Sequence, residues 1–306
     1  MVKNDPLRVW IDSDPALGVE VDGQPRDVDD AFVIVEALRN PRVALAGISV
    51  VFGNAPVDDA FEVANDLVRR VGSPVAVARG AAAPAPPGAD SANEAARAMA
   101  DALRDGPLSV LAIGPLTNLA ALVRGWPERA RAVREVVIVA GRSRDQVFRL
   151  HGATGIPDFN FESDVEAARA LLESGVPIRL AGFELTHRVV VTRAQLEAAR
   201  GRSEVARHLV EGALPWLAFW QSSFPDDPGF HPWDSAALAC LLHPEDFVSE
   251  ARGWRIRTKP DEAPGAAGTP WLECDVSFPG ERVTYVPDFS PGGARAFVER
   301  IGAAIR

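Results

Sequence analysis

Cysteine is scarce in this sequence: only Cys240 and Cys274 occur among 306 residues, and neither has a CxxC partner. This scarcity argues against a disulfide framework and against a zinc ribbon. No run of 18 apolar residues is present, so no membrane-spanning helix is expected. The N-terminal stretch MVKNDPLRVW also lacks the apolar core of a secretory signal. These absences predict a cytoplasmic protein.

Positive charge is also in short supply. The 32 Lys and Arg residues are outnumbered by 42 Asp and Glu residues, which gives a formal net charge of -10 and an isoelectric point of about 5.1. Such a chain is a poor partner for nucleic acid or for an anionic membrane surface, so neither is expected. A neutral or cationic small molecule, or a bound cation, suits it better. We see no internal repeat and no clean boundary, which predicts a single domain over residues 1–306.

Apolar segments with the patterns of strands and helices alternate along the first 190 residues. The β-branched run 43–52 is typical of a buried parallel strand, and an amphipathic helix over 56–71 follows it. A polar stretch, 141–161, is expected to be a long loop. Three later strands, within 253–286, are expected to extend the sheet as a hairpin. The alternation predicts an α/β fold with a doubly wound, mainly parallel central sheet flanked by helices.

Five carboxylates gather between the first predicted strand and the first predicted helix. Asp12 and Asp14 follow the strand, whereas Asp27, Asp29 and Asp30 precede the helix. Acids are common at helix starts because they favour the helix dipole, and this explains one or two of the second group. It does not explain two acids at the end of a buried strand. Crowded carboxylates are tolerated if they are solvated or if a hard cation neutralises them, and the pattern favours a metal or catalytic site.

Polar residues also follow the other predicted strands. In a parallel sheet these strand ends meet at one edge, so the side chains would line one crevice. Nearly all of them are oxygen ligands, which select calcium or magnesium rather than zinc. The set consists of Asn54, Thr117, Asn118, Asp158, Asn160, Glu184 and His187, with Asp234 at a later helix start.

Short motifs occur in a fixed order between residue 8 and about residue 245. They are Asp12-Ser13-Asp14-Pro15, Asp29-Asp30-Ala31, Val51-Phe52-Gly53-Asn54, Gly114-Pro115-Leu116-Thr117-Asn118 and Pro157-Asp158-Phe159-Asn160. Together they resemble the inosine–uridine-preferring nucleoside hydrolase family, whose opening motif is Asp-x-Asp-Pro-Gly-x-Asp-Asp. The resemblance implies the fold of that family and a homodimer or homotetramer. It also implies calcium-dependent hydrolysis of the N-glycosidic bond of ribonucleosides, or of a related ribosyl N-glycoside.

The resemblance also implies a set of metal ligands. Asp14, Asp30, the carbonyl of Thr117 and Asp234 would hold the calcium ion. Asp14 would act in addition as the general base toward the water that the metal binds and activates. Asp12 would brace the carboxylates from behind.

A second set of residues would bind the nucleoside. The resemblance implies that Asp29, Asp158 and Asn160 bind the ribose hydroxyls and that Asn54 supports the site. Buried partners of the 2′- and 3′-hydroxyls would reject a deoxyribose, because they would be left unpaired. Asp158 is one methylene shorter than the Glu that the family has here, so contacts to the 5′ end of the sugar are expected to differ.

An insertion interrupts the first motif. Thirteen residues, ALGVEVDGQPRDV at 16–28, stand between Pro15 and Asp29, where the family usually has two. The insertion is expected at the mouth of the site, where it would act as a lid or a substrate selector. The alternative is a surface insertion without a role.

The group that activates the leaving base is the least defined part of the site. The family often has a His directly before the last metal-binding Asp, where this chain has Trp233, and His231 lies nearby. Either His231 protonates the base or Trp233 stacks on it; otherwise His231 is a solvated loop residue. Trp216, Phe219 and Trp220, at helical spacing, are expected in the core or at a subunit interface rather than in a base pocket.

Two other functions compete with nucleoside hydrolysis. Asp12-Ser13-Asp14 also resembles the DxD motif of haloacid-dehalogenase-like phosphatases, but Ala16 stands where that family expects Thr. The phosphatase hypothesis also leaves the motif at 114–118 unexplained. The second alternative is a protein that binds metal and sugar but has altered or lost catalysis.

Overall fold

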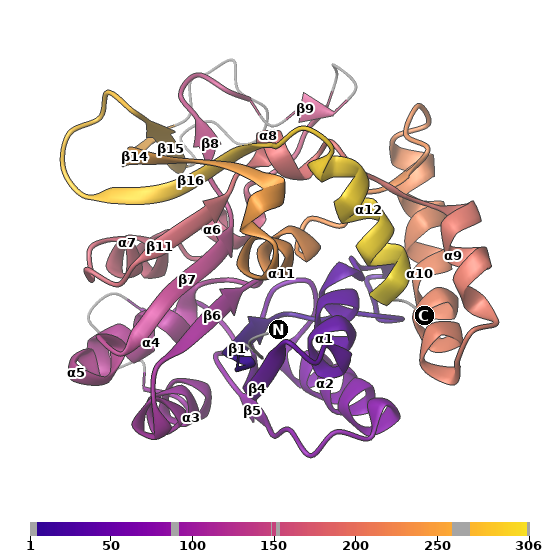
Figure 1. Ribbon diagram of the computed structural model, residues 1–306, viewed down its shortest axis with the longest axis horizontal. Coiled ribbons are helices and arrows are strands. Elements are labelled where there is room, and N and C mark those ends of the chain that lie inside the picture. Colours follow the sequence, from indigo (N-terminus) through magenta and orange to yellow (C-terminus); the bar gives the residue numbers. More distant parts are fainter. Residues whose placement is uncertain (1–4, 87–91, 148, 151–153, 259–269, 305–306) are drawn as a thin grey trace.

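The computed structural model describes residues 5–86, 92–147, 149–150, 154–258 and 270–304 (Figure 1). At its centre lies a ten-stranded sheet. In spatial order the strands are β5 (Val77–Arg79), β4 (Val43–Val50), β1 (Leu7–Ser13), β6 (Leu108–Ala112), β7 (Val133–Val139), β11 (Ile178–Ala181), β16 (Arg282–Phe289), β14 (Phe247–Thr258), β15 (Pro270–Asp275) and β8 (Arg142–Ser143).

Neighbouring strands from β5 to β16 run parallel. The long strand β14 is antiparallel to both β16 and β15. The prediction of a mainly parallel sheet with a hairpin addition is therefore confirmed. The chain runs from β1 outward to β4 and β5, and then returns to β6 on the other side of β1. Such a reversal of strand order opens a crevice at the carboxyl ends of the strands.

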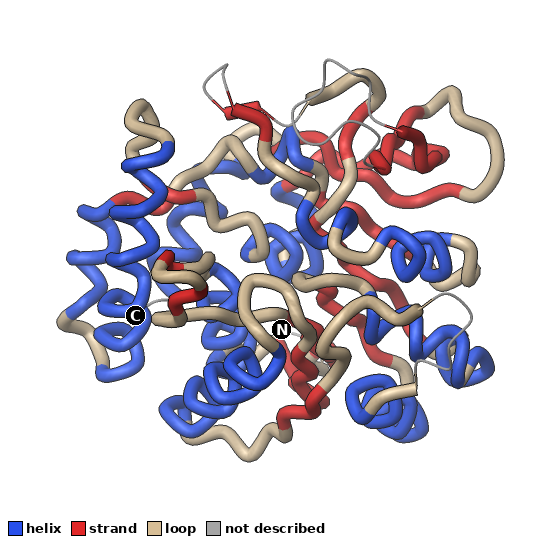
Figure 2. Tube along the Cα trace, turned by 180° about the vertical axis from the view of Figure 1, so that it is seen from behind, coloured by secondary structure: helices blue, strands red, loops and turns tan. Residues whose placement is uncertain are grey.

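Helices cover both faces of the sheet (Figures 1 and 2). One face carries α1 (Asp29–Arg39), α2 (Val57–Val71), α11 (Ser235–Leu242) and α12 (Gly293–Ala304). Beyond this layer lie α9 (Arg193–Arg200) and α10 (Glu204–Ser223), which pack against each other, and α10 also contacts α2 (Figure 1). The other face of the sheet carries α3 (Glu94–Ala102), α4 (Thr117–Gly125) and α7 (Val165–Leu172). Side chains alternate along β1, so Val9 and Ile11 join the first core and Trp10 joins the second.

Shorter elements connect these layers. The short helices are η1 (Leu103–Asp105), α5 (Pro127–Ala130), α6 (Phe159–Glu162), α8 (Phe183–Thr186) and η2 (Pro244–Asp246). The paired short strands are β9 (Arg149–Leu150) with β10 (Thr154–Gly155), and β12 (Val191–Thr192) with β13 (Gly229–Phe230). The expectation of an irregular loop over 141–161 is wrong in part, because this stretch contains β8–β10 and part of α6. A pattern read locally could not reveal β8, since its partner β15 lies far along the chain. Among the described residues, no helix is both long and apolar enough to cross a membrane.

The insertion at 16–28 folds into a small antiparallel hairpin of β2 (Glu20–Val21) and β3 (Gln24–Pro25). Its turn residues, Asp22 and Gly23, have φ values of 55° and 73°. Two successive positive φ angles are typical of the type I′ turn, which Asp-Gly adopts readily. Next to the hairpin, Leu17 is buried against Gly212 of α10. The insertion is thus a folded element that packs on α10.

Candidate active site

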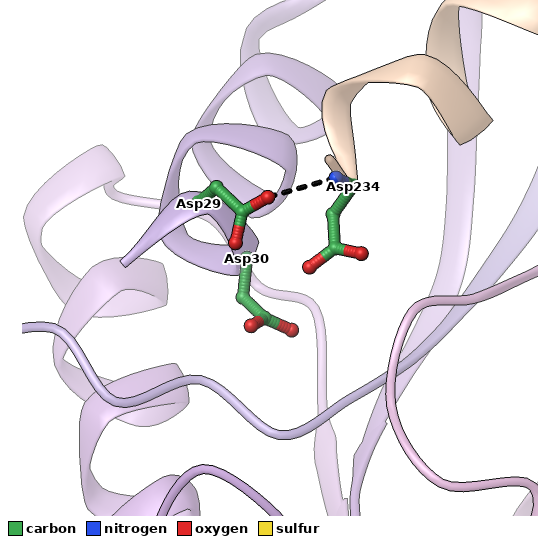
Figure 3. Close-up of side chains that lie close together, drawn as sticks. All are labelled: Asp29, Asp30 and Asp234. Carbon is green, nitrogen blue, oxygen red and sulfur yellow. Dashed lines mark hydrogen bonds between the residues drawn. The ribbon is translucent and has the colours of Figure 1, made fainter. Parts of the chain in front are cut away.

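Three buried carboxylates face one another at the carboxyl edge of the sheet (Figure 3). Asp29 and Asp30 begin α1, and Asp234 directly precedes α11. One oxygen of each lies within 4.8 Å of the others, a spacing that suits a single metal ion. The backbone N–H of Asp234 donates a hydrogen bond to Asp29 Oδ2 at 2.8 Å, which fixes the two helix starts together. Asp30 and Asp234, two of the predicted metal ligands, belong to this group. Its third member is Asp29, which we predicted to bind ribose.

Asp14 lies beside this group and is held by backbone contacts. Its own N–H donates to Asp30 Oδ1 at 3.2 Å, and its Oδ2 accepts from the N–H of Asn54 at 2.7 Å. Gly53 and Gly114 border its carboxylate: a Cβ at Gly114 would stand 2.9 Å from Asp14 Oδ1, and one at Gly53 would overlap Oδ2. The site therefore requires glycine at both positions.

Ser13 is a contributor that the sequence analysis did not identify. Its hydroxyl donates to Asp30 Oδ1 at 2.5 Å, so the residue between the two predicted acids orients a third acid. Its position inside the Asp12-Ser13-Asp14 motif was the only available signal.

The carboxylates of the site are buried and repel one another, so their ionised forms are unfavourable. Asp14 Oδ1 and Asp30 Oδ2 are buried and have no hydrogen-bond partner among the described residues. Burial, followed by the charge of neighbouring carboxylates, raises the pKa of Asp14, Asp29 and Asp234 well above the ordinary range and that of Asp30 to about 7. Buried polar atoms are normally satisfied, and a hard cation with oxygen ligands would satisfy these. This donor set fits a divalent cation.

Asp12 lies behind the cluster. Its Oδ1 accepts hydrogen bonds from Ser49 Oγ at 2.5 Å and from Asn118 Nδ2 at 2.9 Å, and burial raises its pKa to about 6. Asn118 also donates to the carbonyl of Val50 and accepts from the N–H of Ala81. These bonds tie the end of β1 to β4 and α4.

Thr117, the predicted carbonyl ligand, is the first residue of α4. Its hydroxyl donates to Asp164 Oδ2 at 2.6 Å. This bond anchors α4 to the start of α7. It does not involve the carbonyl of Thr117, whose role as a metal ligand stays a prediction.

A cavity of about 240 Å³ opens above the carboxylates. Its lining combines polar and aromatic side chains. The polar residues are Asp27, Asp29, Asn54, Asp158, Asn160, Thr186 and Asp234, and the aromatic ones are Phe159, Phe183, Trp216, Trp220 and Trp233. All five residues that we predicted to bind substrate line it: Asp29, Asn54, Asp158, Asn160 and Trp233.

The two ribose-binding candidates from the α6 region are fixed by backbone groups. Asp158 Oδ2 accepts from the N–H of Gly141 at 2.8 Å, and the buried guanidinium of Arg142 lies 3.9 Å away. Asn160 Nδ2 donates to the carbonyl of Val139 at 3.2 Å. Both side chains are thus anchored to the end of β7, where they face the cavity.

The prediction that Trp216 and Trp220 lie in the core rather than in a ligand pocket is correct in part: Trp220 is buried in the core and Trp216 packs against it, but both also line the cavity. Four residues apart on α10, they share a face, and that face borders the cavity. Their ring centroids are 5.7 Å apart, and Trp220 meets Trp233 edge-on at 6.4 Å. Phe183 stacks on Trp233 at 5.8 Å. Helical spacing alone could not distinguish a core from a cavity wall. Phe219 is not among the lining residues.

His231 does not line the cavity. It is buried, and both ring nitrogens have partners: Nδ1 donates to the carbonyl of Val189 at 2.9 Å, and Nε2 lies 3.1 Å from Asp227 Oδ2. Burial lowers the pKa of the imidazole. The alternative of a solvated loop residue is therefore wrong. The geometry also argues against the predicted proton transfer to a base, because both nitrogens are engaged by Val189 and Asp227 and His231 does not line the cavity.

His231 instead supports the aromatic wall. Its ring packs 4.6 Å from that of Trp233, and Asp227 also accepts from Trp220 Nε1 at 3.0 Å. One buried carboxylate therefore fixes His231 and Trp220 together.

Asp27 is a second residue that the sequence analysis left without a role. It lies at the end of the insertion, lines the cavity and accepts from the N–H of Val28 at 2.7 Å. Burial raises the pKa of Asp27 to about 7. The insertion therefore contributes a carboxylate to the cavity wall.

Comparison with known proteins is consistent with this site. Residues 9–277 match the family described as inosine-uridine preferring nucleoside hydrolase, and the chain belongs to that family. It is therefore a hydrolase that acts on N-glycosyl bonds. The haloacid-dehalogenase-like alternative is wrong. The acidic cluster agrees with the metal dependence of the family.

Curated relatives and solved structures are similar over most of the chain. The probable uridine nucleosidase 1 of Oryza sativa subsp. japonica is 27% identical over 283 residues, which cover 82% of both proteins. The pyrimidine-specific ribonucleoside hydrolase RihA of Enterobacter sp. strain 638 is 29% identical, covering 80% of this chain and 85% of its own. The structure of a purine-preferring ribonucleoside hydrolase from Gardnerella vaginalis superimposes with a TM-score of 0.78 at 19% identity, covering 97% and 99% of the two chains. That likeness confirms the fold.

Proposed function

We propose that this protein is a calcium-dependent hydrolase of the N-glycosidic bond of ribonucleosides or of a related ribosyl N-glycoside. The observation that carries the proposal is the group of buried carboxylates with unsatisfied oxygens, beside a cavity lined by polar and aromatic side chains. The polar side chains of this lining would bind a sugar, and its aromatic side chains would stack on a planar base.

Asp14, Asp30, Asp234 and the carbonyl of Thr117 would hold the calcium ion, and Asp29 is close enough to join them. Oxygen donors alone favour calcium or magnesium over zinc. When bound, the ion would lower the pKa of a water molecule and screen the repulsion among the carboxylates.

The protein's own residues would supply the remaining steps. Asp14 would accept the proton of the attacking water, and its carboxylate is already aimed by the N–H of Asn54. Asp29, Asp158 and Asn160 would bind the ribose hydroxyls and hold the anomeric carbon in place. The surrounding negative charge would stabilise the positive charge that develops on the sugar as the bond to the base breaks. Trp233 would stack on the base.

Three further properties remain predictions. The continuous sheet within the described residues supports a single domain over 1–306. The acidic composition argues against nucleic-acid or anionic-membrane partners, and a cytoplasmic location is proposed as plausible for the family. The family supports a homodimer or homotetramer. A protein that binds metal and sugar without turnover is the second candidate, because no histidine among the described residues faces the cavity.

The test is the release of p-nitrophenol from p-nitrophenyl riboside, a substrate that needs no acid. Calcium-loaded native protein should turn it over, and chelation or Asp14→Asn should lower the rate by at least about a thousandfold. Asp59→Asn, on the exposed face of α2, is the matched control and should behave as native. Folded, calcium-loaded protein without turnover would exclude the hydrolase and leave the binding protein.

A further inference from the structure

One buried cation lies beside a carboxylate of the cavity wall. Arg142, in β8, is 1% exposed, and its guanidinium lies 3.9 Å from Asp158 Oδ2 and 3.8 Å from Glu162 Oε1. Asp158 lines the cavity, whereas Arg142 is not among the lining residues. Burying an arginine is costly, and the two carboxylates offset that cost. No step of the proposed hydrolysis uses this cation.

The guanidinium of Arg142 also lies over an aromatic ring. Its central carbon is 3.8 Å from the ring centroid of Trp271, which is itself buried. β8 pairs with β15 so that Arg142 stands opposite Glu273, and Trp271 lies two residues before Glu273, on the same face of β15. The pairing of the two strands therefore places the ring against which the guanidinium rests. A planar guanidinium stacks on such a ring, and this fixes its orientation in a way that a lysine ammonium would not reproduce.

The two carboxylates next to Arg142 belong to one short segment. Asp158 directly precedes α6 and Glu162 is its last residue, and Glu162 Oε1 accepts a hydrogen bond from the backbone N–H of Asp158 at 3.0 Å. Asp158 Oδ2 also accepts from the N–H of Gly141 at 2.8 Å. Burial lowers the pKa of the guanidinium, and the negative charges of Asp158 and Glu162 oppose this change. Arg142 therefore attracts both the side chain of Asp158 and the residue that holds its backbone.

We propose that Arg142 is a positioning residue for sugar binding: fixed on Trp271, it holds the carboxylate of Asp158 in the orientation that binds a sugar hydroxyl. This inference rests on the proposed function, in which Asp158 binds a hydroxyl of the ribose. A neighbouring cation favours the ionised form of a carboxylate, and an ionised acceptor makes the stronger hydrogen bond. A side chain that is already fixed also loses less freedom when the ligand binds. Arg142 acts through Asp158 and does not touch the substrate.

The test compares p-nitrophenyl riboside with its 2-, 3- and 5-deoxy forms, and each kcat/KM is divided by that of calcium-loaded native protein on the same substrate. Asp158→Asn should lower this ratio by about tenfold or more on every form that retains the hydroxyl bound by Asp158, but not on the form that lacks it. Arg142→Met should lower it by about tenfold in the same pattern. In the Asp158→Asn background, Arg142→Met should change it by less than about twofold, because the two residues act through one contact.

Milder variants separate the charge of Arg142 from its stacking. Arg142→Lys keeps the charge and Trp271→Phe keeps an aromatic ring, so each should lose less than Arg142→Met and in the same pattern. If Arg142→Met does not fold, as judged by circular dichroism, these two variants supply the pattern. Arg255→Lys is the matched control, because Arg255 also lies over an aromatic ring, that of Phe278, and pairs with a buried carboxylate, that of Glu273. None of these three residues is among those that line the cavity, and the control should behave as native on all four substrates.

Two results would overturn the inference while hydrolysis by the native protein stands. One is a loss in the Arg142 variants that is equal on all four substrates, since a general structural defect has no preference for one hydroxyl. The other is a loss that adds in full to that of Asp158→Asn. If folded, calcium-loaded native protein hydrolyses none of the four substrates, the proposed function fails. Calorimetric titration with ribose and its three deoxy forms then makes the same comparison on binding, and it decides the role of Arg142 without turnover.

Discussion

The backbone N–H of Asp234 donates to the carboxylate of Asp29 at 2.8 Å, across 205 positions of sequence. Asp29 begins α1 and Asp234 precedes α11, and these helices pack against each other on the same face of the sheet. The carboxylate group around them can therefore assemble only when the N-terminal and C-terminal parts of the chain have folded together. Binding of a cation there would be coupled to folding of the whole sheet.

Replacing Asp29 by Asn tests this contact. The amide oxygen can still accept from Asp234, whereas the buried charge is removed. Because the pKa of Asp29 is raised by burial and by Asp27, its ionised form destabilises the metal-free fold. Asp29→Asn should therefore raise the free energy of unfolding of chelated protein by about 1–2 kcal/mol, while activity falls at least about a hundredfold. Urea denaturation in chelator and p-nitrophenyl riboside assays measure the two effects. A variant that is destabilised yet fully active would contradict the assignment.

The sequence was sufficient to predict the alternation of strands and helices and a crevice lined by the polar residues that follow the strands. These features follow from local patterns and from the rule that parallel strand ends share an edge. The grouping of Asp14, Asp30 and Asp234 was implied by the family resemblance. The burial of His231 was not predictable, because one of its partners, Val189, is 42 residues away. The side of α10 that carries Trp216 was equally undetermined, since periodicity identifies an apolar face but not what that face meets. The hairpin of β2 and β3 could have been predicted, because Asp22-Gly23 is a strong signal for a hairpin turn that the sequence analysis did not use.

The contact between Leu17 and Gly212 predicts a strong energetic coupling. A Cβ at Gly212 would lie 2.6 Å from Leu17 Cγ, so Gly212→Ala should destabilise the protein by about 1–3 kcal/mol. Leu17→Ala alone should cost about 2–3 kcal/mol. In the Leu17→Ala background the clash is gone, and Gly212→Ala should be neutral or stabilise by up to about 1 kcal/mol through helix propensity.

Urea unfolding of the four proteins in this cycle measures the coupling. Gly302→Ala in α12, where a Cβ meets nothing within 4 Å, is the helical control. Additive effects at Leu17 and Gly212 would show that the hairpin does not pack on α10 as described. Because α10 carries Trp216 and Trp220, Leu17→Ala should also raise KM more than it lowers kcat.

Gly114 predicts a sharp steric limit beside Asp14. A methyl group there would stand 2.9 Å from Asp14 Oδ1 and 3.0 Å from its backbone nitrogen. Gly114→Ala should displace the carboxylate and reduce kcat by about a hundredfold, since small misplacements of catalytic groups are costly. Calcium affinity, measured by titration calorimetry, should fall in the same variant. Gly201→Ala is the control, because its Cβ meets nothing within 4 Å, and it should leave kcat and calcium affinity unchanged. If Gly114→Ala also left both quantities unchanged, Asp14 would have no role in catalysis or metal binding.

His231 predicts a pattern across substrates. If it acted as a general acid, His231→Phe would slow uridine hydrolysis far more than hydrolysis of p-nitrophenyl riboside, which needs no acid. Because both of its nitrogens are occupied and its ring packs on Trp233, we expect both rates to fall by the same factor, about tenfold. Steady-state kinetics on the two substrates distinguish the roles, and a selective loss on uridine would restore His231 as the acid.

The buried carboxylates also predict how stability changes with pH. Burial raises the pKa of Asp12 to about 6 and the pKa values of Asp27 and Asp30 to about 7, above the ordinary 3.8, so the folded chain holds more protons than the unfolded chain between pH 4 and 7. Stability from these groups is complete below about pH 3.8 and is lost as the pH rises through 6 to 7. His231, whose pKa is lowered, acts in the opposite direction, but the shifted carboxylates are more numerous.

Chelated protein should therefore melt on the order of 5 °C lower at pH 8 than at pH 5. Calcium should reverse the order, because it binds deprotonated ligands and stabilises most at pH 8. Thermal unfolding at both pH values, with calcium or chelator, measures this. Asp30→Asn should flatten the pH dependence of the chelated protein and weaken the effect of calcium. Stability that rises from pH 5 to 8 in chelator would mean that the carboxylates are hydrated, and the case for a cation site built on their burial would fail.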